Sequence, residues 1–262
     1  MVIVEDQQVA DLIKGKIAAY IDKSARTPDG LYHVSDLLNP RYAYFKQKFG
    51  HAITETEMGF FVSGIAFHEF LQKILGKEMS EVQLRLENIV GTADQAGVFF
   101  SEIKTSRKWT IPEGADPIYV EQFEKYLAMA GRSFGHIIVI YFTANRSWDG
   151  KKPSTLEIKS WKVTMSEQDR VRAKNVLIER RDGLKLVQDG VNSYESLPLC
   201  WAFKCGKEYK GEVQNLCPFY YSCRPEGRYP LAVLIKNSKK PDTYRDRVRL
   251  SQKLTAELSL DQ

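Results

Sequence analysis

The sequence lacks the features that would place the protein in or across a membrane. No apolar run approaches the roughly 20 residues that a membrane-spanning helix requires. The N-terminus, Met-Val-Ile-Val-Glu-Asp, turns polar too early to be a signal peptide. There is also no internal repeat and no low-complexity tract, which argues against a repeat architecture. We therefore expect a soluble, intracellular protein of the cytoplasm that has no membrane partner.

Cysteine is also scarce, and its four copies lie in one short segment. Thiols stay reduced inside the cell, so this grouping indicates a metal site rather than disulfide bonds. Four thiolates can hold a 4Fe–4S cluster or a structural Zn²⁺ ion, and packed cysteines without metal are the third alternative. The intervals of 4, 11 and 5 residues differ from those of a standard zinc ribbon. The expected ligands are Cys200, Cys205, Cys217 and Cys223.

The charge of the chain is mildly basic rather than extreme. The formal net charge is +5 and the isoelectric point is near 8.8. This balance suits a nucleic-acid partner, although a solvated basic surface explains it equally well. With 262 residues, the chain is long enough to bury a sizeable core in one large domain or two small ones.

The hydrophobic pattern predicts an α/β protein. Patterns near period 3.6 predict helices, and alternating or strongly apolar runs predict strands. The order of helices, three strands, helix, two strands and helix predicts a core with one central mixed sheet flanked by helices. The expected helices cover 6–23, 41–48, 54–76, about 118–131 and 167–188, and the expected strands cover 82–87, 88–94, 97–104, 135–142 and 155–165. We expect N-terminal helices and the core over 1–195, a cysteine-rich cap over 196–228 and a basic tail over 229–262.

The stretch from Asp94 to Lys104 is the most informative part of the sequence. Glu102 and Lys104 are two residues apart, so on a strand they share one face while Ile103 turns into the core. The Gln-Ala-Gly turn after Asp94 predicts a hairpin that returns the chain beside Glu102. Two carboxylates and an ammonium group at one point suit a divalent cation and metal-assisted phosphodiester hydrolysis. The Ile103 carbonyl is a further candidate ligand, and an ordinary surface strand is the alternative.

Histidine supplies one more candidate ligand. His68 follows Gly64 on an apolar helical stretch, and its imidazole would favour Mn²⁺ over Mg²⁺. A packed core histidine is the more frequent explanation of such a residue, and we keep it for the other three. These are His33, His51 and His136.

Gln122 and Tyr126 form a candidate supporting pair. They are four residues apart and so share one face of the predicted helix. An amide and a phenol at this spacing could orient Lys104 or contact a DNA backbone. A solvated helix face without function is the alternative.

Together these motifs resemble the RecB-type PD-(D/E)XK nucleases. The shared set, in the order and spacing of that family, is Gly64-x3-His68, Asp94, Glu102-x-Lys104 and Gln122-x3-Tyr126. The segment that begins at Tyr32 also resembles family members that carry an iron–sulfur cluster, which include the CRISPR-associated adaptation nuclease and the nuclease domains of bacterial recombination helicases. The resemblance covers roughly residues 30 to 225.

The resemblance implies a restriction-endonuclease-like core and assigns roles to its residues. It implies that Lys104 is catalytic and that Gln122 and Tyr126 support it. The implied metal ligands are His68, Asp94, Glu102 and the Ile103 carbonyl. It also implies an iron–sulfur cluster, but the family usually takes one cluster ligand from the position just before Pro-Arg, which is Asn39 here. The cluster would then need all four ligands from the C-terminal cysteines, or one ligand that is not cysteine.

Basic and aromatic residues suggest where DNA would bind. Cations and aromatics alternate from Arg41 to Lys48, a pattern that can bind phosphates and stack bases, although an amphipathic helix with packed aromatics explains it equally well. Arg107 and Lys108 follow the catalytic strand closely enough to touch a substrate backbone. The candidate contacts are Arg41, Tyr44, Lys46, Arg107 and Lys108.

The sequence therefore predicts a Mg²⁺- or Mn²⁺-dependent deoxyribonuclease. We expect it to act on single strands or free ends, as an exonuclease more than an endonuclease. Expected partners are DNA and other proteins of recombination, replication or CRISPR adaptation. The alternatives are a catalytically silent DNA-binding subunit of a larger complex and an RNA- or tRNA-processing enzyme on the same fold.

Overall fold

A computed structural model describes most of the central part of the chain. The described residues are 16–17, 30–50, 55–75, 79–96, 99–106, 108, 110–144, 155–200, 207–209, 212–214, 217, 219 and 223. Most of the predicted helix over 6–23 and all of the predicted basic tail lie outside them. No helix in the described ranges is long and apolar enough to cross a membrane.

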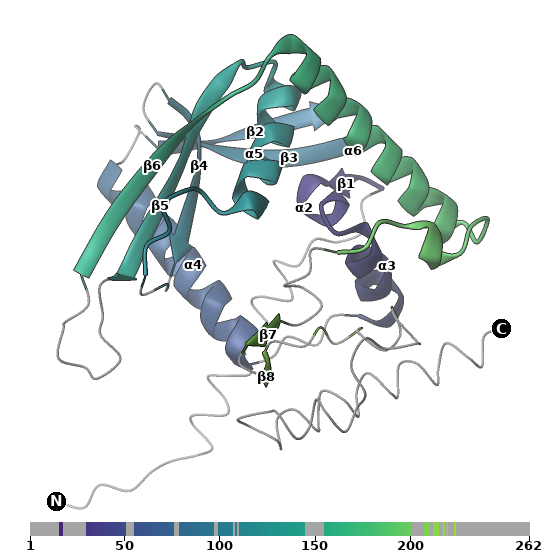
Figure 1. The fold of residues 1–262 in the computed structure, drawn as a ribbon, viewed down its shortest axis with the longest axis horizontal. Coiled ribbons are helices and arrows are strands. Elements are labelled where there is room, and N and C mark those ends of the chain that lie inside the picture. Colours follow the sequence, from purple (N-terminus) through teal and green to yellow (C-terminus); the bar gives the residue numbers. More distant parts are fainter. Residues whose placement is uncertain are drawn as a thin grey trace, which may run out of the picture. The chain divides into compact units, whose positions relative to one another are not determined.

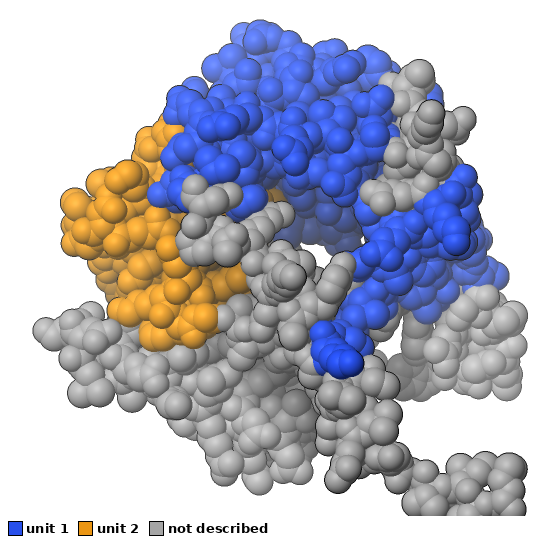
Figure 2. Space-filling view, turned by 180° about the vertical axis from the view of Figure 1, so that it is seen from behind, with its two compact units in different colours: residues 1–34, 52–177 blue, residues 35–51, 178–262 orange. Residues whose placement is uncertain are grey.

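The chain forms two compact units, which Figure 2 colours separately. Unit 1 comprises residues 1–34 and 52–177, and unit 2 comprises residues 35–51 and 178–262. The long helix α6, Glu167–Gln188, contributes residues to both. The predicted three-part division into core, cap and tail stays a prediction.

Unit 1 contains a six-stranded mixed sheet (Figure 1). β3 pairs antiparallel with β2 and β4 and parallel with β1, β4 pairs parallel with β5, and β5 pairs antiparallel with β6. The strands are β1 (Tyr32–His33), β2 (Met79–Leu86), β3 (Ile89–Ala96), β4 (Phe99–Ser106), β5 (Phe134–Ala144) and β6 (Thr155–Thr164). The mixed sheet with flanking helices confirms the predicted fold class.

β3 and β4 pair at one end only and then diverge; we call the point where they diverge the fork. β2 occupies one edge of β3 along its whole length, so β4 and β1 share the other edge. β4 pairs with β3 only from Asp94 to Ala96, and β1 pairs with it only at Ile89 and Val90. β3 and β4 therefore separate beyond the Asp94–Ser101 pair, where a backbone donor of β4 is left without a partner in β3.

Helix α5, Pro117–Ala130, covers one face of the sheet. Asp116 accepts a hydrogen bond from the Ile118 N–H at its N-terminus, and Gly131 ends it in the left-handed conformation with φ 66°. Phe123 is fully buried against β5. A Cβ on Gly135 would lie 2.6 Å from the Phe123 ring, so glycine is required for this close approach.

Helix α4, Glu55–Leu75, lies over the opposite face. Gly91 contacts Tyr126 of α5, whereas Asp94, three residues further along β3, faces His68 of α4. Side chains three apart on a strand point to opposite faces, so the sheet lies between the two helices. Each face of β4 therefore has a helix over part of its length. We expected Ile103 to be the buried residue of this strand, but it is half-buried while Glu102 is only 3% exposed.

Unit 2 is built around an aromatic cluster. α3, Pro40–Phe49, places Phe45 against Phe219 and Cys223, which are all buried. Tyr42, Phe49, Tyr194 and Cys217 pack around these three. The other elements with residues in this unit are α2 (Val34–Leu37), the 3-10 helix η2 (Tyr194–Ser196), β7 (Lys207–Tyr209) and β8 (Glu212–Gln214).

Candidate metal centre

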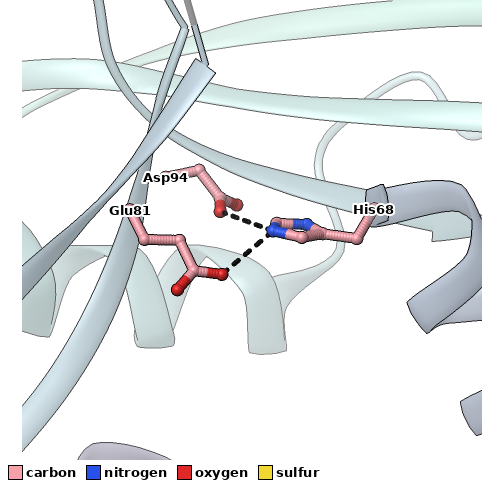
Figure 3. Close-up of side chains that lie close together, drawn as sticks. All are labelled: His68, Glu81 and Asp94. Carbon is pink, nitrogen blue, oxygen red and sulfur yellow. Dashed lines mark hydrogen bonds and ion pairs between the residues drawn. The ribbon is translucent and has the colours of Figure 1, made fainter. Parts of the chain in front are cut away.

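Three potential metal ligands meet at one point on the α4 side of the sheet (Figure 3). The His68 Nε2 atom lies 3.0 Å from a Glu81 carboxylate oxygen and 3.9 Å from an Asp94 carboxylate oxygen. One ligand atom from each residue lies within 4.8 Å of the others. We call His68, Glu81 and Asp94 the metal group. Glu81 is half-exposed and Asp94 is buried, so the group opens to solvent on its Glu81 side.

The fork in the sheet holds Asp94 in place. The Asp94 carboxylate accepts a hydrogen bond of 2.8 Å from the Ile103 N–H, which is the donor exposed where β4 leaves β3. The neighbouring Ser101 hydroxyl donates to the Asp94 carbonyl at 3.4 Å. The side chain therefore replaces a missing strand pairing, which fixes one carboxylate oxygen and leaves the other facing His68.

Burial makes the ionised state of both site carboxylates unfavourable. Desolvation raises the pKa of Asp94 above 3.8, although the Ile103 N–H and the His68 and Lys104 charges oppose it, and the Glu81 charge raises it further. Desolvation also raises the pKa of Glu102, against the opposing charge of Lys104. A bound cation would remove this cost by supplying positive charge where negative charges gather.

Lys104 and Glu102 form an ion pair on the α5 side of β4. Burial works to lower the pKa of Lys104, but the Glu102 carboxylate outweighs it and the pKa is raised. Lys104 is therefore an ammonium ion at neutral pH. Its Nζ atom lies 5.9 Å from the centre of the Tyr119 ring, and 27% of the side chain is exposed. The side chain is therefore partly open to solvent.

The predicted pair on α5 forms as expected. The Gln122 amide donates a 2.8 Å hydrogen bond to the Tyr126 hydroxyl, and Tyr126 is buried. Tyr126 packs over Gly91, where a Cβ would lie 2.7 Å from the ring. The phenol interacts electrostatically with Lys104 and favours its charged form. Gly91 therefore lets α5 bring this pair close to Lys104 of β4.

The structure brings two of the predicted metal ligands together and adds a third candidate ligand that the sequence analysis did not name. Among the described residues, the metal group contains His68 and Asp94 as predicted but has Glu81 where we expected Glu102. Glu102 lies close enough to interact electrostatically with Asp94 and His68, but its carboxylate is paired with Lys104. The Ile103 carbonyl stays a prediction. The strand register could have indicated Glu81, because it lies directly opposite Asp94 in the β2–β3 hairpin.

The residues predicted to contact DNA belong to both units, with Arg41, Tyr44 and Lys46 in unit 2 and Arg107 and Lys108 in unit 1. Arg41 is buried in unit 2, where its guanidinium donates to the Glu195 and Leu197 carbonyls at 2.7 Å each. Tyr44 packs against Tyr194. This packing favours the alternative of an amphipathic helix with packed aromatics. Lys46 is half-buried, and Arg107 lies outside the described residues. Lys108 pairs with Asp116 at 2.9 Å, so α5 holds its amine.

The cysteines are described in part. Cys223 is buried and Cys217 packs against the aromatic cluster, while Cys200 is half-buried. Cys205 lies outside the described residues. The Arg41 guanidinium donates to the Cys223 sulfur at 3.8 Å, and a cation there suits a thiolate. Asn39 is buried in the same unit, at the N-terminus of α3. No three cysteines among the described residues lie close enough together to hold a metal ion, so the cluster and its ligand set stay predictions.

Comparisons with known proteins give weak structural likenesses only. The chain is similar to a protein called SSO0001, with 14% identity, a TM-score of 0.44, and coverage of 72% of this chain and 88% of that one. It is also similar to an alkaline exonuclease, LHK-Exo, from Laribacter hongkongensis, with 11% identity, a TM-score of 0.37, and coverage of 62% and 93%. The same exonuclease in complex with dAMP gives 10% identity and a TM-score of 0.33, with the same coverage. No protein-family model and no curated protein sequence matches the chain.

Proposed function

We propose that this protein is a metal-dependent nuclease that hydrolyses phosphodiester bonds in DNA. The observation that carries the proposal is the closeness of the metal group to the Glu102–Lys104 pair, whose charges act on Asp94 although the pair projects from the other face of β4. A metal site beside a fixed ammonium ion is the arrangement that phosphoryl chemistry requires. The basic net charge of the chain suits the same substrate.

The donor set fits a divalent cation. His68 would supply a nitrogen ligand, and Glu81 and Asp94 would supply carboxylate oxygens, which suits Mn²⁺ and, less well, Mg²⁺. Glu102 stands near as a further oxygen donor, since its carboxylate interacts electrostatically with Asp94 and His68. A bound metal would lower the pKa of a water molecule and polarise the scissile phosphate.

Lys104 would act as a cation rather than as a base. Its raised pKa keeps the proton on the amine, so it cannot deprotonate water at neutral pH. It can donate hydrogen bonds to a phosphate oxygen as negative charge develops there. Glu102 holds the ammonium group in position, and Tyr126, which is hydrogen-bonded to Gln122, interacts with it electrostatically on the α5 side.

We further propose that the substrate is a single strand or a free DNA end and that exonuclease action predominates. The support is the sequence resemblance to end-directed nucleases. An iron–sulfur cluster on the C-terminal cysteines belongs to the same proposal. Visible absorbance of anaerobically purified protein would distinguish it from Zn²⁺, which is colourless.

A cleavage assay with matched variants tests the proposal. Labelled single- and double-stranded DNA, with each end blocked in turn, would be incubated with Mn²⁺, Mg²⁺ or EDTA. We expect cleavage only with metal, and a loss of about 100-fold or more in Lys104→Ala and in Asp94→Asn. Lys185→Ala is the matched control, because Lys185 is an exposed cation paired with Asp189 on α6. Full activity of Lys104→Ala and Asp94→Asn would overturn the proposal.

A further inference from the structure

A patch of exposed aromatic rings lies on the sheet beside the metal group. Phe99 of β4 is 53% exposed and Phe134 of β5 is 48% exposed. The His136 ring stands edge-on to both, with centroid distances of 5.2 Å to Phe99 and 6.4 Å to Phe134. The Nζ atom of the exposed Lys162, on β6, lies 4.6 Å from the centre of the Phe134 ring. We call Phe99, Phe134, His136 and Lys162 the aromatic patch.

The strand register joins this patch to the metal group. Asp94 pairs with Ser101, Ser101 pairs with His136, and His136 pairs with Lys162. Directly paired residues project from the same face of a sheet, so the patch and the Asp94 carboxylate face the same side. Two strand spacings, about 10 Å, separate the backbones of Asp94 and His136. That distance equals the axial length of about three stacked nucleotides in one strand.

Charge changes sign along this row of paired residues. Glu81 lies opposite Asp94, so carboxylates occupy one end, and Lys162 occupies the other. The acidic residues of β4 and β6 in the described part of the chain, Glu102 and Glu157, alternate onto the other face. A phosphate backbone would therefore meet a cation at the patch and would meet carboxylates only where a metal ion can bind.

We infer that the aromatic patch binds the bases of an unpaired DNA strand whose phosphodiester reaches the metal group. This inference rests on the proposed nuclease function and names a surface that the substrate contacts. Exposed phenylalanine rings stack on any base, and the ammonium group of Lys162 binds the neighbouring phosphate. The bases of a duplex are already stacked on one another, so the patch selects strands whose bases are free.

Binding without metal tests the inference apart from catalysis. Fluorescence anisotropy in EDTA would compare a labelled 12-nucleotide oligo(dT), the same length of abasic strand, and a duplex. We expect the protein to bind oligo(dT) more tightly than the other two. Phe99→Ala and Phe134→Ala should each weaken oligo(dT) binding by about tenfold, and Phe99→Trp should retain it. Lys162→Ala should reduce the salt dependence of binding by about 0.7 in logarithmic slope.

Leu156→Ala is the matched control, because Leu156 is 63% exposed near the other end of β6. Equal affinity of the wild type and Phe99→Ala/Phe134→Ala for oligo(dT), or no preference over the abasic strand, would overturn the inference. A wild-type dimer that these substitutions convert to a monomer would also overturn it, since the patch would then bind a second copy. Normal oligo(dT) binding without cleavage in Mn²⁺ would instead contradict the nuclease function.

Discussion

The metal group of unit 1 and the aromatic cluster of unit 2 both involve buried charge, but they stabilise it in opposite ways. In unit 2, the Arg41 guanidinium donates to the carbonyls of Glu195, Leu197 and Cys223. In unit 1, Asp94 and Glu81 place like charges near one another, and desolvation raises the pKa of Asp94. The first arrangement is satisfied by the protein itself, whereas in the second desolvation outweighs the nearby His68 and Lys104 charges, and a bound metal ion would offset that cost.

This difference separates a structural charge from a functional one. A buried cation whose donors meet carbonyls holds segments together and has little left for a ligand. Carboxylates kept together at a cost to folding indicate a site shaped for a ligand rather than for stability. Removing the buried charge should therefore lower the stability of the protein in unit 2 and raise it in unit 1.

The largest effect is expected in unit 2. Arg41→Ala would leave two buried carbonyls and one part-buried carbonyl without this donor, and the free energy of unfolding should fall by about 3 kcal/mol or more. Lys48→Ala, at an exposed cation of the same helix, should change it by less than about 0.5 kcal/mol. Urea unfolding of both variants measures the contrast. Equal losses would mean that Arg41 does not organise unit 2.

Metal should stabilise the wild-type protein through unit 1. Mn²⁺ at 100 times its dissociation constant should raise the free energy of unfolding by about 2.7 kcal/mol. Because the pKa values of Asp94 and Glu102 are raised, protons compete with the metal and the gain should shrink as the pH falls. Thermal unfolding with and without Mn²⁺ at several pH values measures this stabilisation. A stabilisation by Mn²⁺ that grows as the pH falls would contradict the proposed metal site.

Close packing between α5 and the sheet gives a smaller effect. In Gly91→Ala the new methyl group would meet the Tyr126 ring at 2.7 Å, which should cost about 1–3 kcal/mol and slow cleavage by displacing the Gln122–Tyr126 pair. A Cβ on Gly114 would meet nothing within 4 Å, so Gly114→Ala is the control. Urea unfolding and cleavage rates together test this, and indistinguishable variants would show that Tyr126 has room to move.

The smallest effect has the opposite sign. Asp94→Asn removes a carboxylate that is costly to ionise, so metal-free protein should gain about 1 kcal/mol. The folded pKa of Asp94 lies above the unfolded value of 3.8, so the folded protein binds its proton more tightly. The gain should therefore be full above the folded pKa and vanish as the pH falls to about 3.8. Unfolding in EDTA across this range measures it, and a loss of stability at pH 8 would contradict the account.

The sequence predicted most of the fold because its elements carry strong local patterns. The helices at Pro40–Phe49, Glu55–Leu75 and Glu167–Gln188 and the hairpin after Ile89 appear close to their expected limits. The two-residue strand β1 was missed, since it is too short to show a period. Its pairing with β3 depends on the fork, which is a property of the assembled sheet.

The candidate site was predictable only where its residues lie in local sequence motifs. His68, Asp94 and Lys104 were recognised from their motifs, and the Gln122–Tyr126 bond follows from helix spacing. Glu81 carries no motif, because its place beside Asp94 is set by strand register. The pattern from Arg41 to Lys48 could not be assigned from sequence, since alternating basic and aromatic residues are the same whether the aromatics bind DNA or pack against Phe219.

Electron paramagnetic resonance of bound Mn²⁺ is the most direct test of the metal centre. His68 is the nitrogen donor of the metal group, so pulsed spectra should show a coupled imidazole nitrogen in the wild type. This coupling should disappear in His68→Gln and persist in Lys185→Ala. The account predicts one such Mn²⁺ ion per chain. A bound Mn²⁺ ion without nitrogen coupling, or with the same coupling in His68→Gln, would contradict it.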